Sequence, residues 1–298
     1  MDEKQKWENL TISNDFMFAK VMRNRDICRK ILEKILKVEI KRIEYHEEQK
    51  EIKISYDSKS VRLDVYVKDE KNTVYNLEMQ TTNTRNLPKR SRYYQGMIDL
   101  DLIEKGKSYN KLNKSFVIFI CTFDPFGEGR HIYTFKYICE ENKELYLNDE
   151  GIKIFLNSKG KLEDVDEDVK SFLKYVDGRF TDNELVREID EEIKRVKGNK
   201  EWEAEYMTLL MREIEIEERA LERGKEEGRK EGIKLGEERG IKLGEERGIK
   251  LGEEKGIKTL IRFCREFNFS LEDTYKQIME KYKLAPDNAK EMIRKYWK

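Results

Sequence analysis

The feature that most constrains this chain is a run of nine glycines spaced four residues apart, from Gly224 to Gly256. The unit Gly-Ile-Lys-Leu-Gly-Glu-Glu-Arg begins at Gly232 and recurs at Gly240 and, with lysine in the last place, at Gly248. Six lysine–glutamate pairs four residues apart favour a helix by ~0.2–0.5 kcal/mol each. Each glycine opposes a helix by ~1 kcal/mol relative to alanine. The glycines outweigh the pairs, so we do not expect an isolated rigid helix.

Two structures remain for residues 224–258. A seven-residue coiled-coil seam does not fit an eight-residue unit that has two apolar positions. We expect a helical spacer or an oligomerisation arm, either frayed or held by a partner chain whose backbone approaches the glycines closely. A disordered linker produced by repeat expansion is the alternative. Phosphate binding by these glycines is not expected, because no strand–loop–helix context surrounds them.

Composition limits how the rest of the chain can act. Charged residues make up 41% of the 298 residues and hydrophobic residues 38%, which indicates a chain only partly committed to a compact core. With 61 basic and 61 acidic residues, no global field draws the chain onto nucleic acid or membrane. Any basic surface must therefore be local.

Histidines and cysteines are few and scattered. His46 and His131 are the two histidines, and the four cysteines form no pairwise motif. A disulfide scaffold and a zinc knuckle are not supported, and a nucleophile activated by histidine is not expected. Any catalysis would then depend on carboxylates and a metal.

Nothing in the sequence predicts a membrane partner. The longest apolar run, residues 116–121, has six residues, against roughly 18 or more for a spanning helix. The charged first residues lack the apolar stretch of a secretory signal. We expect a reduced, soluble, cytoplasmic protein.

The apolar pattern predicts an α/β core of mixed sheet flanked by helices, followed by a mainly helical extension. Helices are expected after the capping residues Ser13-Asn14-Asp15, from a cap at Asp26, and over 87–104; strands are expected over 61–67, 74–80, 116–121, 132–138 and 152–156. We divide the chain into this core (1–160), a charged helical region (161–223), the glycine repeat (224–258) and a small cap (259–298) with helices starting near Ser270 and Pro286.

Two acids on neighbouring predicted strands are the best candidates for chemistry. Asp64 interrupts an apolar alternation, and Glu78 lies between Leu77 and Met79. Glu78 and Gln80 share one face of their strand, so Asp64, Glu78 and Gln80 converge if the strands pair. Two carboxylates on rigid strands suit Mg²⁺, which can activate water against a phosphodiester. The alternative is that both acids simply face solvent.

Short segments in a fixed order carry a family resemblance. They are 14–18 (NDFMF), 62–65 (RLDV), 76–80 (NLEMQ), 90–94 (RSRYY), 106–109 (GKSY) and 123–127 (FDPFG). With these segments, residues 8–160 resemble the Rpn family of recombination-promoting nucleases, also called PD-(D/E)XK family transposases. The resemblance extends more loosely over the helical remainder.

The resemblance implies a restriction-endonuclease-like core that cuts DNA with a divalent metal, Mg²⁺ or alternatively Mn²⁺ or Ca²⁺. Asp64 and Glu78 match the metal-binding acids, and the Met79 carbonyl is a further candidate ligand. Gln80 stands in the position of the usual lysine, and glutamine at this position is common in the family. The resemblance does not identify the general base. Asp15 is a candidate third acid, with a simple helix N-terminal carboxylate as the alternative.

A local basic segment follows the predicted active-site strand. Between Arg85 and Lys114 there are eight basic and three acidic residues. We expect phosphate contacts that are largely blind to DNA sequence, from Arg85, Lys89, Arg90, Arg92 and Tyr94. The alternative for Tyr94 is packing against the sheet.

Three functions are consistent with these patterns. The first is a metal-dependent DNA endonuclease acting in recombination or on mobile DNA. The second is a DNA-binding or assembly protein on a nuclease fold that no longer cleaves, an alternative that the neutral Gln80 keeps open. The third is an interaction scaffold built around the helical half, in which the chain forms a homo-oligomer through the repeat.

Overall fold

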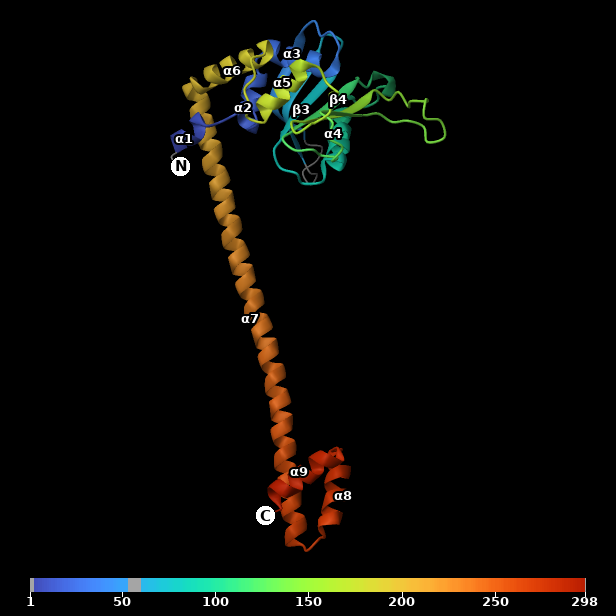
Figure 1. Cartoon of the computed structure of the whole chain (residues 1–298), viewed down its shortest axis with the longest axis vertical. Coiled ribbons are helices and arrows are strands. Elements are labelled where there is room, and N and C mark those ends of the chain that lie inside the picture. Colours follow the sequence, from blue (N-terminus) through green and yellow to red (C-terminus); the bar gives the residue numbers. More distant parts are fainter. Residues whose placement is uncertain (1–2, 53–59, 298) are drawn as a thin grey trace. The chain divides into compact units, whose positions relative to one another are not determined.

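The structure is a computed structural model that describes residues 3–52 and 60–297, and Figure 1 traces its helices and strands. The strands are β1 (Ile43–Ile52), β2 (Val61–Asp69), β3 (Val74–Gln80), β4 (Ser115–Cys121), β5 (Ile132–Phe135) and β6 (Gly151–Asn157). The helices are α1 (Glu3–Glu8), α2 (Asp15–Met22), α3 (Arg25–Leu36), α4 (Leu87–Leu102), α5 (Glu167–Val176), α6 (Glu184–Lys197), α7 (Lys200–Glu266), α8 (Leu271–Tyr282) and α9 (Pro286–Tyr296). A 3-10 turn covers Tyr109–Lys111.

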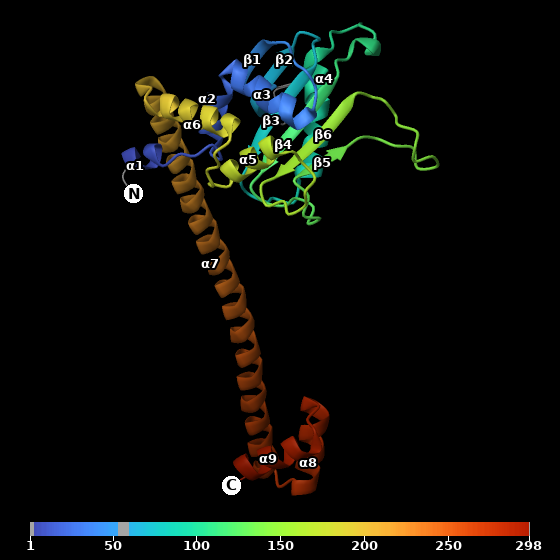
Figure 2. The same cartoon turned by 45° about the horizontal axis from the view of Figure 1, so that its top comes forward.

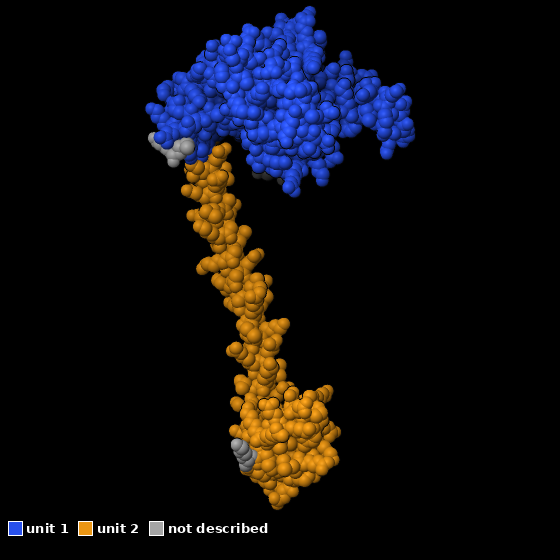
Figure 3. All heavy atoms as spheres, in the orientation of Figure 1, with its two compact units in different colours: residues 1–211 blue, residues 212–298 orange. Residues whose placement is uncertain are grey.

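The chain divides into two compact units, residues 1–211 and residues 212–298, coloured separately in Figure 3. Helix α7 begins in the first unit and ends in the second. The first unit holds the sheet together with α5 and α6, whose apolar residues join the same hydrophobic core as those of α2 and α3. The core thus continues past residue 160, and the four-part division of the chain stays a proposal.

The first unit is built on a mixed sheet, which the described residues form in the order β1-β2-β3-β4-β6-β5. Strands β3, β4 and β6 are parallel to one another, while β1, β2 and β5 run antiparallel to their neighbours. Parallel central strands are buried on both faces, and each of β3, β4 and β6 is buried along its whole length. The predicted α/β class with a mixed sheet is confirmed.

Helices cover the two faces of the sheet in different numbers. Figure 2 shows α2, α3, α5 and α6 on one side and α4 on the other. Along β3, Tyr75, Leu77 and Met79 enter the core under the first group, whereas Val74 enters the core under α4. Because side chains alternate along a strand, Asn76, Glu78 and Gln80 lie on the α4 face. This face carries the candidate site.

Several predicted elements are confirmed, and a few boundaries were wrong. Asn14 caps α2 as expected, but the second helix is capped by Asn24, with Asp26 in its first turn. The predicted strand over 132–138 ends at Phe135, and an isolated bridge joins Ile138 to Tyr146. Strand β1 was not predicted. Its charged sequence lacks apolar alternation, and it forms by pairing with β2.

The second unit ends in a small helical cluster. Ser270 caps α8 and Pro286 opens α9, as predicted. Ile257 and Ile261 of α7 pack there with Ile278, Ala289 and Ile293. Burial of this small apolar set fixes the end of α7 against the two short helices.

The glycine repeat is helical throughout, as part of α7. From Gly224 to Gly252, a methyl group added at any of the glycines would meet open space. At Gly256 it would collide with the hydroxyl of Tyr282. One glycine therefore has a packing reason within the described chain, and the eight before it do not.

In the described part of the chain, no helix combines the length and the apolar character needed to cross a bilayer.

Candidate active site

The hairpin of β2 and β3 stops pairing where the two candidate acids begin. The backbone register runs from Lys68 opposite Val74 to Val65 opposite Leu77. Asp64 and Glu78 come next along the two strands, so the predicted hairpin and its convergence are present. Beyond Val65, backbone N–H groups of the two strands donate hydrogen bonds to the carboxylates of Asp64 and Glu78 and not to backbone carbonyls of the opposite strand.

Asp64 and Glu78 are joined by reciprocal hydrogen bonds. The backbone N–H of Asp64 donates to Oε1 of Glu78 over 3.2 Å, and the backbone N–H of Met79 donates to Oδ2 of Asp64 over 3.0 Å. Each strand therefore holds the side chain of the other. The two acids are positioned by backbone, which makes the pair rigid.

Glu78 is almost completely buried, with 1% of its surface exposed. Besides the Asp64 N–H, its Oε1 accepts a bond of 3.0 Å from Nδ2 of Asn76. Its Oε2 accepts a bond of 3.1 Å from Nη2 of Arg90. A buried carboxylate needs this kind of compensation, and Glu78 has three donors.

The surroundings of the two acids raise the pKa of both carboxyl groups. Burial raises the pKa of Glu78 well above its ordinary value, the charge of Asp64 raises it further, and the charge of Arg90 opposes the rise. Burial also raises the pKa of Asp64, with the Met79 N–H opposing and the charge of Asp15 adding to the rise. Two carboxylates that repel each other at a buried site form a place where a cation is stabilised.

Gln80 is tied to Arg90. Its Oε1 accepts a bond of 2.6 Å from Nη1 of Arg90, and its Nε2 donates to the Thr82 carbonyl over 2.7 Å. Sequence reasoning placed Gln80 in the position of a lysine, and the structure puts a guanidinium against it. The neutral amide and the arginine together bring positive charge to that position.

Arg90 has its guanidinium engaged on all sides. Its Nε donates to the Tyr94 hydroxyl over 2.8 Å, and the group lies 5.1 Å from the Tyr94 ring and 5.2 Å from the Phe119 ring. The sequence suggested Arg90 and Tyr94 as DNA contacts. The structure gives both of them partners inside the site. The alternative for Tyr94, packing on the sheet, fits its contact with Phe119 at 6.0 Å between ring centroids.

Asp15 lies at the start of α2 and is exposed. Its Oδ1 accepts the N–H of Phe16 over 2.8 Å, which agrees with a helix N-terminal carboxylate. A cavity of about 420 Å³ has Asp15 on one wall and Met79 and Gln80 on another. Within the described ranges, no three His, Cys, Asp or Glu side chains gather closely enough to hold a metal ion. A third acidic ligand is therefore not assembled beside Asp64 and Glu78.

The donor set still fits a divalent cation in its chemistry. Asp64 and Glu78 offer hard carboxylate oxygens, and Mg²⁺ is commonly bound by one or two carboxylates, with waters completing the shell. The observation in favour is that reciprocal hydrogen bonds hold the two carboxylates side by side, where a cation between them would relieve their repulsion. The Met79 carbonyl stays a proposed ligand.

The remaining basic residues line separate hollows. Lys89, Arg90 and Tyr94 line a cavity of about 490 Å³ together with Arg62 of β2. Arg92 lines a different cavity, on the flank of α4 that faces β5 and β6. Arg85 is exposed in the loop before α4 with a positive φ of 55°.

Sequence reasoning missed Arg62, Asn76 and Phe119 as parts of the site. Asn76 could have been found, because it is two residues before Glu78 and so shares its face. Arg62 is two residues before Asp64, and its charge lowers the pKa of that acid. Phe119 is opposite Glu78 on the neighbouring strand, a pairing that local sequence does not reveal.

Comparison with known proteins identifies a family. Residues 13–223 match the model of a family described as PD-(D/E)XK nuclease family transposase. No curated protein and no solved structure gave a significant match to the chain. The match spans both acids, the basic helix and all strands of the described sheet.

Proposed function

Since the chain belongs to the PD-(D/E)XK nuclease family transposases, we propose that it is a metal-dependent DNA endonuclease. It would hydrolyse phosphodiester bonds in recombination or in the movement of DNA. The observation that carries the proposal is the reciprocal bonding of Asp64 and Glu78 at the end of the β2–β3 hairpin. A cytoplasmic location belongs to the same proposal.

The metal would be held by Asp64, Glu78 and the Met79 carbonyl, with Asp15 as a more distant acid. When bound, Mg²⁺, or Mn²⁺ or Ca²⁺ in its place, supplies Lewis-acid stabilisation of the developing charge and a more acidic water. Asp64 must be ionised to act, and the N–H of Met79 holds it in place.

Gln80 and Arg90 together would replace the usual lysine, Gln80 by positioning and Arg90 by its positive charge. The amide of Gln80 is neutral and fixes the guanidinium. Arg90 carries the positive charge, which stabilises an oxyanion that develops on the phosphate. Charge-assisted hydrogen bonds of this kind are stronger than those of neutral donors.

DNA would be held along the basic residues around α4. Lys89 and Arg62 share a cavity with Arg90, and Arg85 and Arg92 are exposed nearby in sequence. Lysine and arginine contacts to phosphate fix register but carry little sequence information. We therefore propose binding that is largely nonspecific in sequence.

Plasmid cleavage tests the nuclease proposal. Full-length protein is compared with Asp64→Asn and Glu78→Gln in Mg²⁺, Mn²⁺ and Ca²⁺, with Glu104→Gln as the exposed control. We expect loss of at least 100-fold in rate for the two site variants, on the scale of about 2.7 kcal/mol for a lost transition-state contact. Equal cleavage by Asp64→Asn would overturn the assignment.

An inactive DNA-binding or assembly protein is the second candidate. It is favoured by one observation, the bond from Arg90 to Oε2 of Glu78, which fills an oxygen that a metal would use. DNA binding that survives chelation, with no nicking in any of the three metals, would select this function.

The helical repeat is our proposed oligomerisation arm. Each unit exposes an isoleucine and a leucine; among them, Ile241 and Leu243 are more than half exposed. Open space at glycines such as Gly240 and Gly248 allows another helix to approach closely. Deleting 224–255, which spares Ile257 of the C-terminal cluster, should lower the oligomeric mass in solution; an unchanged mass would contradict the arm.

A further inference from the structure

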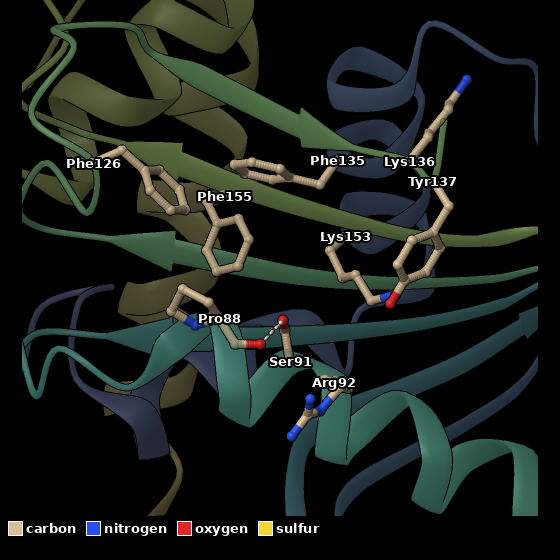
Figure 4. Close-up of a pocket in the computed structure, with 9 residues that line it drawn as sticks. All are labelled: Pro88, Ser91, Arg92, Phe126, Phe135, Lys136, Tyr137, Lys153 and Phe155. Carbon is tan, nitrogen blue, oxygen red and sulfur yellow. Dashed lines mark hydrogen bonds between the residues drawn. The ribbon is translucent and has the colours of Figure 1, made fainter. Parts of the chain in front are cut away.

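A second cavity on the α4 side of the sheet has no part in the chemistry described above. It has a volume of about 250 Å³ and lies between the start of α4 and the β5–β6 edge of the sheet (Figure 4). Its apolar wall consists of Phe126, Phe135 and Phe155. The centroids of these rings lie 5.0–5.7 Å apart.

The aromatic wall combines rigid and accessible rings. Phe155 is only 2% exposed, while Phe135 is 44% and Tyr137 is 49% exposed. Phe155 is fixed further by stacking on Phe119 at 5.5 Å. A planar group entering the cavity would therefore find ring surface that is already held in place. The three phenylalanine rings are inclined to one another by 52° to 87°, so a nucleobase can stack on one of them at a time. Exposed aromatic rings bind nucleobases by stacking, and Phe135 offers such a ring.

The charged side chains that line the cavity are all basic. Arg92 and Lys136 are exposed, and Lys153 is 9% exposed. Figure 4 shows Lys153 on the sheet side of the cavity and Arg92 on the helix side. No acid lines it among the described residues. A cavity with three cations and no anion selects an anionic ligand.

The buried ammonium of Lys153 is the strongest evidence for an anionic ligand. Its ammonium makes no hydrogen bond or ion pair within the described ranges, and it lies 4.7 Å from the Tyr137 ring. Its charge acts on the carboxyl of Asp99 in α4, where it opposes the rise in pKa that burial causes. Burying a cation without a partner is costly, and an anion in the cavity would remove that cost.

The cavity is close to the candidate active site. Across the sheet Glu78 is opposite Phe119, and Phe119 is opposite Phe155. Adjacent strands are ~4.8 Å apart, so Glu78 and Phe155 are roughly 10 Å apart along this row. Successive phosphates of a stacked strand are about 3.4 Å apart along the helix axis. A strand bound at Glu78 would reach the cavity within a few nucleotides.

We propose that this cavity binds one unpaired nucleotide of a DNA single strand, with the base stacked on Phe135 and the phosphate beside Lys153 and Arg92. The proposal rests on the proposed nuclease function for its choice of DNA. Inorganic phosphate alone would leave the aromatic wall unused, and a neutral apolar ligand would leave Lys153 without its counter-charge.

A fluorescent base analogue tests the proposal. Full-length protein in EDTA, which prevents cleavage, is titrated with a single strand carrying 2-aminopurine. Stacking on the aromatic wall should quench its fluorescence. Phe135→Ala and Lys153→Gln should each weaken strand binding by about 5- to 50-fold and reduce the quench. Tyr109→Ala and Lys111→Gln, at exposed positions in the same unit, are the matched controls and should change binding less than twofold.

Phe135 is a surface ring, so its variant keeps the test valid if the Lys153 variant fails to fold. Equal quenching by the wild type and Phe135→Ala overturns the proposal. If free dAMP binds more tightly than the strand, with the same dependence on Phe135 and Lys153, the cavity is a mononucleotide site and the assignment to a strand is wrong. Quenching without plasmid cleavage rejects the nuclease function alone, whereas cleavage without quenching rejects this cavity alone.

Discussion

Arg90 donates to Glu78 over 3.1 Å from the first turn of α4, and the same guanidinium binds Gln80 over 2.6 Å. A buried acid on a central strand is thus paired with a base on the helix that covers it. The pair links the candidate site to the packing of α4 on the sheet. Changing either residue should alter stability as well as chemistry.

Removing Arg90 should destabilise the first unit. In Arg90→Met, Glu78 loses its cation and its pKa rises further. We expect the free energy of unfolding to fall by about 2–4 kcal/mol, as when one partner of a buried charge pair is deleted. Urea unfolding followed by circular dichroism measures the change. Lys89→Met, an exposed change on the same helix, is the control; equal losses in both variants would contradict the pairing.

The two acids should make stability depend on pH in an unusual direction. Both pKa values are raised in the folded state, above the ordinary carboxyl values near ~4. At a pH between the ordinary carboxyl pKa and the raised pKa values, the folded state binds more protons than the unfolded state. The free energy of unfolding therefore falls as pH rises. Without metal, the wild type should lose about 1 kcal/mol or more between mildly acid and mildly alkaline pH.

Glu78→Gln should flatten that pH dependence, because it removes one titrating group and the repulsion on the other. Denaturant midpoints of both proteins at a series of pH values decide the matter. Saturating Mg²⁺ at alkaline pH should restore stability to the wild type and not to the variant. Identical pH slopes in the two proteins would show that these acids titrate normally.

The local parts of the fold and the β2–β3 hairpin could be predicted from sequence, and the contacts of α4 and of β1 with the sheet could not. The alternation around Asp64 and the apolar run of β4 follow from side-chain periodicity, and the spacing of Glu78 and Gln80 fixes their common face. The position of Arg90 against Glu78 depends on how α4 packs over the sheet. Strand β1 forms through its neighbour and has no apolar pattern of its own.

Asp15 should act on the site through its charge and not as a ligand. It is exposed, and its negative charge raises the pKa of Asp64. Asp15→Asn should therefore lower that pKa and weaken Mg²⁺ binding less than about tenfold, below the loss of ~10–100-fold typical of even an indirect metal contact. Calorimetric titration with Mg²⁺ measures the affinity, with Asp26→Asn as the exposed control. A loss of several hundredfold would make Asp15 a ligand.

The glycines of α7 should respond differently to alanine according to what lies beside them. In the single chain Gly248 faces open space, so in protein diluted to the monomer Gly248→Ala should stabilise the helix by ~1 kcal/mol. At Gly256 the new methyl group meets the hydroxyl of Tyr282, whose ring packs against the cluster of α8 and α9. Gly256→Ala should gain less or lose stability, because Tyr282 must move. Thermal unfolding by far-ultraviolet circular dichroism compares the two, and Gly256→Ala,Tyr282→Ala should recover the helical gain. If Gly256→Ala stabilises the chain as much as Gly248→Ala does, Tyr282 does not constrain this position.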